Sequence, residues 1–402
     1  MPSALPSGEP APHDGSLPAA ALAELGDGPI SLYLHVPFCA TRCGYCDFNT
    51  YTAAELGSAS GSSRDAYLAA AHAEIELAAR VLGRRGVDTV FVGGGTPTLL
   101  TAAELVGLLS AVRDRFDLAP QAEVTTECNP ESVDLPYLAA LAEGGFNRIS
   151  FGMQSARPHV LRVLERRHTP GRVPDVVRWA RAAGFGSVSL DLIYGTPGES
   201  LDDWRASLEA ALACEPDHVS AYALIVEDGT RLAAQIRRGE VPAPVDDDQA
   251  DFYEAAEAVL TSSGLDWYEL SNWSRPGHAC RHNLAYWRGA PWWGLGPGAH
   301  SHVGGVRWWN VKHPRSYSTA LEQGRSPAAA REVLTAEDRR VERVLLESRL
   351  AEGLALDVLT PSEQGRVAGL VAHGLVHVDE QRMELTLKGR LLADAVVRDL
   401  LD

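Results

Sequence analysis

Lysine is almost absent from this chain of 402 residues: Lys312 and Lys388 are the only two, so arginine carries nearly all of the positive charge. The formal net charge is −17 at pH 7, and no stretch gathers basic residues into a patch. A surface of this sign repels phosphate backbones and anionic lipid headgroups. The composition therefore argues against a nucleic-acid-binding or membrane-surface protein.

The sequence also lacks any apolar run of the roughly 18 residues that a membrane-spanning helix needs. Its N-terminus has neither the basic nor the apolar region of a signal peptide. Six cysteines are too few to form a disulfide framework in a chain of this length. We therefore expect a cytoplasmic protein without a transmembrane segment and with reduced thiols.

What the sequence does contain is a regular alternation of strand and helix patterns. Residues 1–28 are rich in Pro, Ala, Ser and Gly, and we expect a disordered tail there. From residue 29 to 264, six units each consist of a β-rich run followed by a segment with helical spacing. Such units predict a parallel sheet with helical crossovers, either open and doubly wound or curled into a partial barrel. The six predicted strands are 30–36, 88–94, 122–128, 148–154, 187–193 and 218–224.

The alternation stops after residue 264. Residues 265–330 are rich in Gly, Trp and His, and we expect a loop-rich cap over one end of the sheet. Residues 331–402 predict helices and two short strands at hairpin spacing, an order that resembles a winged-helix module. Acidic residues outnumber basic ones in this module, so we expect an interaction or structural role rather than DNA binding.

Three of the cysteines stand close together just after the first predicted strand, as Cys39, Cys43 and Cys46. Soft thiolates at this C-x3-C-x2-C spacing suit three irons of a [4Fe-4S] cluster, and the fourth iron is then open. An open iron can chelate S-adenosylmethionine and pass an electron to its sulfonium. The alternative is a structural zinc site with His35 as fourth ligand, although closed zinc sites usually consist of two paired half-motifs.

The run from Tyr33 to Phe38, followed by these cysteines, resembles the radical SAM superfamily. It is most similar to the branch that contains the oxygen-independent coproporphyrinogen III dehydrogenases (HemN type) and the heme chaperones (HemW type). The resemblance extends from about Ile30 to the C-terminal module. It implies an α/β fold with a partial (β/α)6 radical SAM TIM-like barrel, a [4Fe-4S] cluster on the three cysteines, and bound S-adenosylmethionine.

The resemblance also implies which residues hold S-adenosylmethionine. An aromatic hydroxyl lies near the ligand, and a glycine-rich loop, GGGTP at 93–97, meets its amino group through the backbone. Two carboxylates, an amide and an arginine hold the nucleoside and methionine parts, which is chemically reasonable. These four follow strand ends, where α/β sheets place ligands. The implied positions are Tyr33, Gly94, Gly95, Thr96, Glu127, Gln154, Arg166 and Asp191.

Three features distinguish the two types within the branch. The dehydrogenases carry a fourth cysteine two residues after the third, where this chain has Phe48, and a structured N-terminal arm, where it has the low-complexity tail. The run from His282 to Trp287 matches the HNxxYW motif typical of the heme chaperones. It lies among seven of the nine tryptophans, and flat aromatic rings beside an imidazole could hold a heme. We therefore interpret His282 as a heme ligand.

The alternative for this region is that the tryptophans form a packing core and that His282 is hydrogen-bonded to a carbonyl. Cys280, His300 and His302 are rival heme ligands. The function that the resemblance implies is a HemW-like heme chaperone, which transfers heme to apo-hemoproteins such as respiratory-chain components. The alternative function is oxidative decarboxylation of coproporphyrinogen III, so whether the chain is an enzyme stays open. Relatives that self-associate leave a homodimer open as well.

Overall fold

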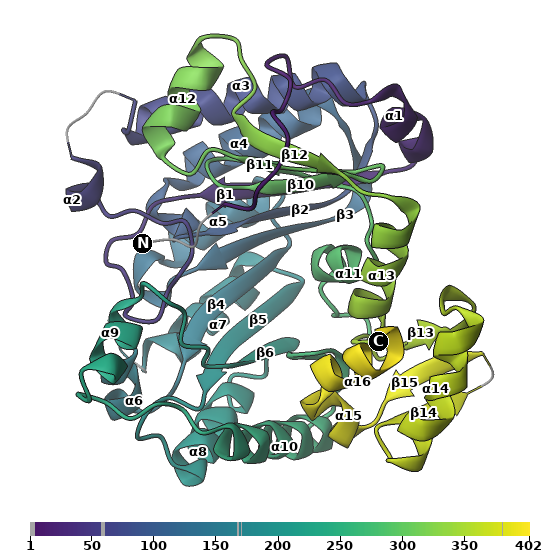
Figure 1. Ribbon diagram of the computed structural model, residues 1–402. Helices are drawn as coiled ribbons and strands as arrows, with labels where there is room; N and C mark the ends of the chain where they lie inside the picture. Colours follow the sequence, from purple (N-terminus) through teal and green to yellow (C-terminus); the bar gives the residue numbers. More distant parts are fainter. Residues whose placement is uncertain (1–4, 58–60, 167–168, 170, 380) are drawn as a thin grey trace.

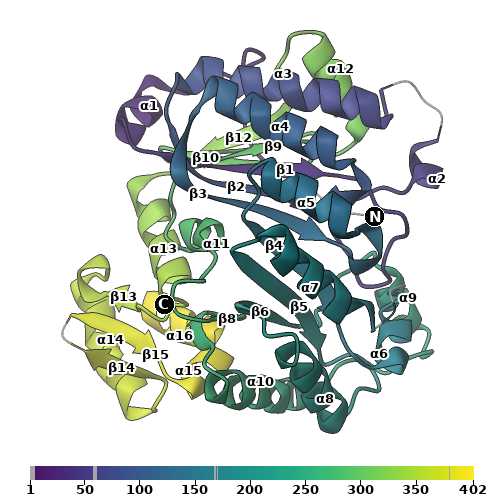
Figure 2. The ribbon, with the colours of Figure 1, turned by 180° about the vertical axis from the view of Figure 1, so that it is seen from behind.

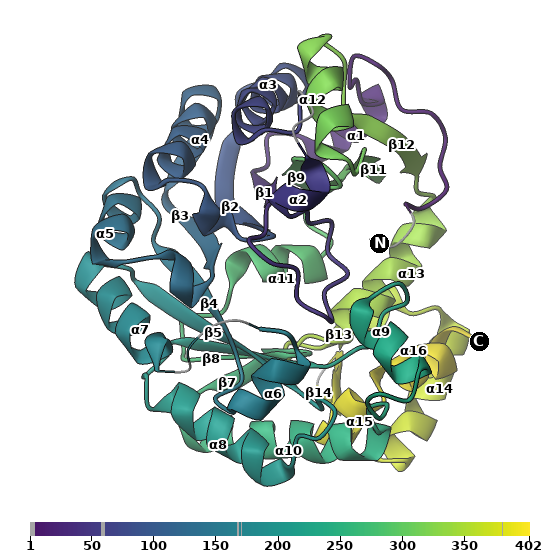
Figure 3. The same cartoon turned by 90° about the vertical axis from the view of Figure 1, so that its left-hand side faces the viewer.

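The computed structural model of the chain describes residues 5–57, 61–166, 169, 171–379 and 381–402. Its main feature is a twelve-stranded sheet in the order β12-β11-β10-β9-β1-β2-β3-β4-β5-β6-β8-β7. The sheet curls around an inner space, and helices cover its outer face (Figure 1, Figure 3). The six predicted strands are confirmed as parallel neighbours in chain order. They are β1 (Ile30–Val36), β2 (Gly86–Gly94), β3 (Asp117–Cys128), β4 (Arg148–Gln154), β5 (Ser187–Tyr194) and β6 (His218–Ala223).

The helices between these strands pack on the outside of the sheet (Figure 2). Several begin at side chains that cap the first turn: Thr101 and Glu104 form a capping box, and Ser63 caps the preceding long helix. Across the described ranges, no helix combines the length and the apolar character needed to cross a bilayer. The helices of this part are α2 (Ala53–Leu56), α3 (Arg64–Leu82), α4 (Ala102–Arg115), α5 (Leu135–Glu143), α6 (Pro158–Val163), α7 (Arg172–Ala183), α8 (Leu201–Leu212), α9 (Arg231–Arg237) and α10 (Asp246–Ser262).

The loop-rich cap predicted for residues 265–330 is wrong, because this region forms strands that extend the sheet at both edges. Two strands add antiparallel to β6. At the other edge one strand adds parallel to β1, and three more follow antiparallel. Each has only three to six residues, which is too short for an alternating pattern to stand out among glycines. The elements are β7 (Asp266–Glu269), β8 (Asn272–Ser274), α11 (Arg281–Trp287), β9 (Trp292–Leu295), β10 (His300–Val303), β11 (Val306–Asn310), α12 (Pro314–Glu322) and β12 (Ala328–Val333).

The disordered tail predicted for residues 1–28 is also corrected over residues 5–28. A short helix, α1 (Ala19–Leu25), buries Ala21 and Leu25 against the main core, one turn apart. Upstream, Glu9 forms an isolated β-bridge and an ion pair with Arg331 of β12. The composition concealed this order because Pro and Ser dominate, whereas the residues that pack are a few widely spaced apolar ones. Residues 1–4 lie outside the described residues.

The C-terminal module has its own hydrophobic core around Val344, Leu370 and Leu400. A three-stranded antiparallel sheet in the order β13-β15-β14 packs against helices, as the winged-helix prediction requires. Arg390 connects this module to the barrel through an ion pair with Glu257 of α10. The elements are α13 (Ala336–Glu347), β13 (Leu354–Ala355), α14 (Pro361–Ala372), β14 (Val376–Asp379), β15 (Arg382–Leu385), α15 (Leu387–Leu391) and α16 (Ala393–Leu401).

Candidate cofactor site

Polar side chains recur at every second residue along the inner face of the parallel strands. In β5 these positions are Ser187, Ser189 and Asp191, and the residues between them are apolar and buried. The register of the strands places Glu127 beside Ser150, and Ser150 beside Ser189. Since side chains alternate across a strand, the barrel acquires a polar interior inside an apolar shell.

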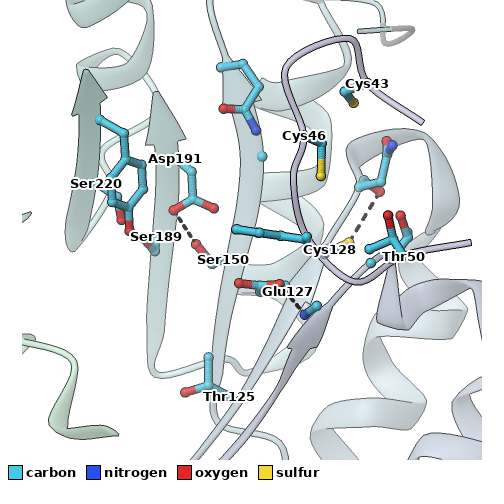
Figure 4. Close-up of a pocket in the computed structure, with 18 of the residues that line it drawn as sticks. Cys43, Cys46, Thr50, Thr125, Glu127, Cys128, Ser150, Ser189, Asp191 and Ser220 are labelled. Carbon is cyan, nitrogen blue, oxygen red and sulfur yellow. Dashed lines mark hydrogen bonds between the residues drawn. The ribbon is translucent and has the colours of Figure 1, made fainter. Parts of the chain in front are cut away.

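The C-terminal ends of the strands open into a cavity of about 760 Å³. Figure 4 shows the loop with Cys43 and Cys46 lying over the strands that carry Glu127, Ser150 and Asp191. The volume falls within the range of about 300–1,000 Å³ that is usual for small-molecule sites. All of the site residues predicted from the sequence line this cavity. They are Tyr33, Cys39, Cys43, Cys46, Gly94, Gly95, Thr96, Glu127, Gln154, Arg166, Asp191 and His282.

The cysteines lie on a loop that is held to itself and to the segments that follow β9 and β11. The backbone N–H of Cys39 donates to the carbonyl of Tyr51 over 3.0 Å, which closes the loop on itself. The side-chain amide of Asn49 donates to the carbonyls of Pro297 and Lys312 over 2.9 Å each. Burial raises the pKa of the Cys46 thiol to about 12, so this thiol is protonated at neutral pH until a metal displaces its proton.

The donor set fits an iron-sulfur cluster better than a single ion. In the described part of the chain, no three His, Cys, Asp or Glu side chains converge closely enough to hold one metal ion, as a zinc ion with ligands at about 2.0–2.3 Å requires. The predicted fourth zinc ligand, His35, has both ring nitrogens in use. Its Nδ1 is 3.0 Å from the Tyr33 hydroxyl and its Nε2 is 2.9 Å from the Asn49 carbonyl. In a cluster, by contrast, each thiolate binds a different iron.

The glycine-rich loop that follows β2 has no room for side chains. A Cβ at Gly95 would lie 2.4 Å from the Phe38 carbonyl oxygen, and one at Gly94 would lie 2.6 Å from the His35 ring. Gly94 also has a φ of 106°, which side chains disfavour. The N–H groups of Gly94, Gly95 and Thr96 all donate within the protein. Because a ligand's amino group donates hydrogen bonds, the backbone of this loop can meet it through carbonyl oxygens.

Two half-buried carboxyl groups line the cavity, Glu127 from β3 and Asp191 from β5. Glu127 accepts a hydrogen bond of 3.0 Å from the Gly94 N–H, and Asp191 accepts one of 2.8 Å from the Ser150 hydroxyl. Burial, and then the charge of Asp191, raise the pKa of Glu127 to about 8. Burial also raises the pKa of Asp191. No cation pairs with Glu127 among the described residues, and a cationic ligand would relieve this electrostatic cost.

Arg166 brings a buried positive charge to the cysteine loop. It donates to the Sγ of Cys43 over 3.7 Å and to the carbonyl of Gly152 over 3.2 Å, while its Nε is buried without a partner. A Cβ at Gly152 would lie 2.7 Å from this guanidinium, so the glycine makes room for it. Gln154 is buried at the end of β4 with a φ of 61°, a conformation that often marks ligand sites.

The HNxxYW motif forms α11, which lies inside the curve of the sheet (Figure 3). Glu123 of β3 accepts hydrogen bonds from the backbone N–H groups of Arg281 and His282 over 3.1 and 3.0 Å. The His282 ring is buried, with Nδ1 2.7 Å from the Thr89 hydroxyl and Nε2 2.9 Å from the Tyr286 hydroxyl. In this conformation His282 offers no free nitrogen to an iron, although it lines the cavity.

Sequence reasoning missed most of the polar residues that face the barrel interior. The buried group around Arg148 is an example: its guanidinium donates to the Ser187 hydroxyl over 3.0 Å, and the His218 ring lies 2.7 Å from the Ser189 hydroxyl. Their signal is the period of two, since each strand alternates polar and apolar residues in this region. A β-rich run identifies a strand, and only this alternation separates the two faces of that strand.

Comparison with known proteins agrees with this geometry. The sequence model of the Radical SAM superfamily matches residues 33–211. The chain is 54% identical over 380 residues to the heme chaperone HemW of Mycobacterium tuberculosis (strain ATCC 25618 / H37Rv). This alignment covers 94% of this chain and 97% of that protein. It is 33% identical to the heme chaperone HemW of Escherichia coli (strain K12) over 92% of this chain and 97% of that one.

Among solved structures, coproporphyrinogen III oxidase HemN of Escherichia coli, a radical SAM enzyme, superimposes with a TM-score of 0.81 at 26% identity. The alignment covers 96% of this chain and 94% of that one. The predicted fold class and family are thereby confirmed, and the superfamily carries a [4Fe-4S] cluster and S-adenosylmethionine. The chain belongs to the HemW family of heme chaperones within the radical SAM superfamily.

Proposed function

We propose that this chain binds heme and transfers it to apo-hemoproteins, with a [4Fe-4S] cluster and S-adenosylmethionine supporting or regulating the transfer. The observation that carries the proposal is the 54% identity to a heme chaperone HemW over nearly the full length of both chains. The HNxxYW motif and Phe48, in place of a fourth cysteine, are consistent with it.

We further propose how the cavity at the C-terminal ends of the strands, called the first cavity below, holds the cofactors. Cys39, Cys43 and Cys46 bind the cluster, which supplies one-electron chemistry when present. The loop of Gly94, Gly95 and Thr96 accepts hydrogen bonds from the amino group of S-adenosylmethionine. Its ribose hydroxyls and methionine carboxylate bind to the remaining polar residues, because carboxylates accept hydrogen bonds from hydroxyls and a guanidinium pairs with a carboxylate. The remaining residues are Tyr33, Glu127, Gln154, Arg166 and Asp191.

The test is a heme titration of the anaerobically reconstituted full chain, followed by mixing with an apo-hemoprotein. We expect saturable binding of one heme per chain and a gain of heme by the acceptor. The same preparation should release no protoporphyrinogen from coproporphyrinogen III. A chain that binds no heme would contradict the proposal.

The alternative is a coproporphyrinogen III dehydrogenase, and the structural likeness to HemN over 96% of this chain favours it. In that case, expression of the chain should restore growth of a strain that lacks the dehydrogenase. The chaperone proposal expects no rescue. Robust product formation by the purified protein would replace the chaperone proposal with this one.

We propose that delivery takes place in the cytoplasm, and that the recipients include respiratory-chain components. All six cysteines are free thiols in the structure, which suits a reducing compartment. Co-purification of tagged protein with heme-depleted membranes and with cytosol tests the recipient class. Analytical ultracentrifugation with and without heme distinguishes a monomer from the homodimer that the resemblance leaves open.

A further inference from the structure

A second cavity, of about 1340 Å³, opens beside the first. Residues of the added strands β9–β11 and of helix α13 in the C-terminal module line it. Pockets for small ligands usually measure about 300–1,000 Å³, so this one has room for a larger ligand. Residues that line both cavities form a shared wall, so the two sites are neighbours. They are Tyr33, Phe48, Gly94, Glu127 and Tyr286.

One wall of the second cavity carries two tryptophans and two histidines. Strand pairing places His302 opposite Trp292 and His300 opposite Trp309, so the rings lie in pairs on one face of the sheet. The ring centroids are 5.2 Å apart in the first pair and 5.9 Å apart in the second. The Trp309 ring is buried, at 2% exposure, whereas Trp292 is partly exposed and offers flat aromatic surface to a planar ligand.

Of the four candidate heme ligands named from the sequence, His300 has the most accessible side chain. Its side chain is exposed toward the cavity and makes no side-chain hydrogen bond among the described residues. The rivals are less free: His282 has both nitrogens in use, the Cys280 thiol donates to the Glu123 carboxylate over 3.5 Å, and the Nε2 of His302 is buried. An iron can therefore reach His300 without breaking a contact.

The same wall supplies positive charge. Lys312, one of only two lysines, lines the cavity and lies close enough to His300 to act on its charge. It forms no ion pair in the described part of the chain, and the charge that acts on it is that of Asp47. An ammonium without a fixed partner can bind a carboxylate of a ligand. An indole ring, an open imidazole and an ammonium suit the flat face, the iron and the propionates of an iron porphyrin.

We propose that the second cavity is the heme site, an inference that rests on the proposed function. His300 binds the iron, the porphyrin lies against Trp292, and a propionate pairs with Lys312. Heme then lies next to S-adenosylmethionine but outside the barrel interior. The helix α13 closes the other side, so the C-terminal module takes part in holding the cargo.

The experiment is a titration of the reconstituted full chain with ferric heme, followed by absorbance and electron paramagnetic resonance. We expect His300→Ala to lose the signals of an imidazole-bound iron and to bind heme at least about tenfold more weakly. Added imidazole should restore these signals, which a merely structural role of His300 would not allow. His302→Ala, on the same strand, is the matched control and should keep them. Lys312→Gln should weaken binding without altering the iron signals.

The outcomes separate this inference from the proposed function. If the wild-type chain binds no heme, the proposed function itself fails. If the wild type binds heme and His300→Ala gives the same spectrum and affinity, only the heme site is wrong. Loss of the imidazole signals in His302→Ala or His282→Ala, but not in His300→Ala, also overturns the assignment of His300.

Discussion

At the scale of single residues, the first cavity is lined by a carboxyl group and a guanidinium that both lack a full set of partners. Glu127 has no cationic partner among the described residues, and Arg166 keeps a buried Nε without an acceptor. Unsatisfied buried groups of this kind destabilise the protein unless a ligand binds them. S-adenosylmethionine carries a cationic sulfonium, an amino group and a carboxylate, so it can pair with both the Glu127 carboxylate and the Arg166 guanidinium.

Replacing Glu127 by glutamine should change how stability depends on pH. Burial raises the pKa of this carboxyl from 4.5 to about 8 in the folded chain, so the folded state binds a proton that the unfolded state has released. The free energy of unfolding of the ligand-free protein therefore falls as the pH rises from about 4.5 to about 8. Glu127→Gln removes this contribution and should make the fall shallower.

Urea titrations at a series of pH values measure the effect. Glu74 and Glu199, whose pKa values burial raises to about 7, remain in the variant and preserve part of the slope. Glu209→Gln, at an exposed carboxylate, is the matched control and should retain the full slope. An unchanged slope in Glu127→Gln would show that Glu127 is ionised in the folded chain.

His282 allows a second prediction at this scale. His282→Ala removes two buried hydrogen-bond partners, those of Thr89 and Tyr286, and leaves a cavity beneath α11. We expect the free energy of unfolding to fall by about 1–3 kcal/mol, as measured by chemical denaturation. The spectrum of bound heme should stay the same. An altered spectrum with unchanged stability would instead make His282 a ligand.

The sequence was enough to find residues that line one cavity but not their hydrogen-bond partners. Cys39, Cys43 and Cys46 could be found because their spacing is local, and Glu127 and Asp191 because the resemblance to the radical SAM superfamily implied them. The bonds of His282 to Thr89 could not be found, because the two residues are 193 positions apart and meet only through tertiary packing. Periodicity gives the face on which a side chain lies and not the atom that it contacts.

At the scale of elements, the sequence predicts those strands that have a strong local pattern and misses those that depend on tertiary contacts. Strand bounds for β1 and β4 were predicted to the residue, since long runs with a buried face carry a strong signal. The strands β7–β12 were missed because each is short and is stabilised by pairing with strands distant in sequence. The glycines of residues 93–95 were visible, but the Phe38 carbonyl that approaches Gly95 was not.

Alanine substitutions at two glycines should differ in their effect: one should weaken the binding of S-adenosylmethionine, and the other should raise stability. Gly95→Ala would place a methyl group 2.4 Å from the Phe38 carbonyl oxygen, so the loop must move and S-adenosylmethionine should bind more weakly. Gly107 lies inside α4, and nothing lies within 4 Å of the position that an added methyl group would take there. Gly107→Ala should therefore raise the free energy of unfolding by about 0.5–1 kcal/mol.

Isothermal titration with S-adenosylmethionine and thermal unfolding of both variants test this pair. The Gly107 variant controls for the general effect of an added methyl group. Full affinity for S-adenosylmethionine in Gly95→Ala would mean that the loop is not part of the site.

At the scale of the whole molecule, the C-terminal module has its own core and contacts the barrel through ion pairs, a β-bridge between Glu269 and Leu350, and the apolar side chains of α15. Arg390 of α15 forms two hydrogen bonds, of 2.8 and 3.2 Å, with the Glu257 carboxylate. Its guanidinium also lies 3.9 Å from the centroid of the Trp267 ring. Because α13 of the same module forms a wall of the second cavity, this contact bears on the site proposed for heme.

Arg390→Ala should loosen the module without unfolding the barrel. The change leaves the largely buried Glu257 carboxylate without its cation and uncovers the Trp267 ring, and it should lower the stability of the docked arrangement by about 1–3 kcal/mol. Hydrogen exchange should rise in α13–α16 and along α10, and stay the same in β1–β5. Heme affinity should fall, while S-adenosylmethionine, held by the barrel, should bind as before.

Arg205→Ala, which removes an exposed pair with Asp202, is the control and should change neither the heme affinity nor the hydrogen exchange. Equal loss of both affinities in Arg390→Ala would mean that the module stabilises the whole barrel and does not act on the second cavity.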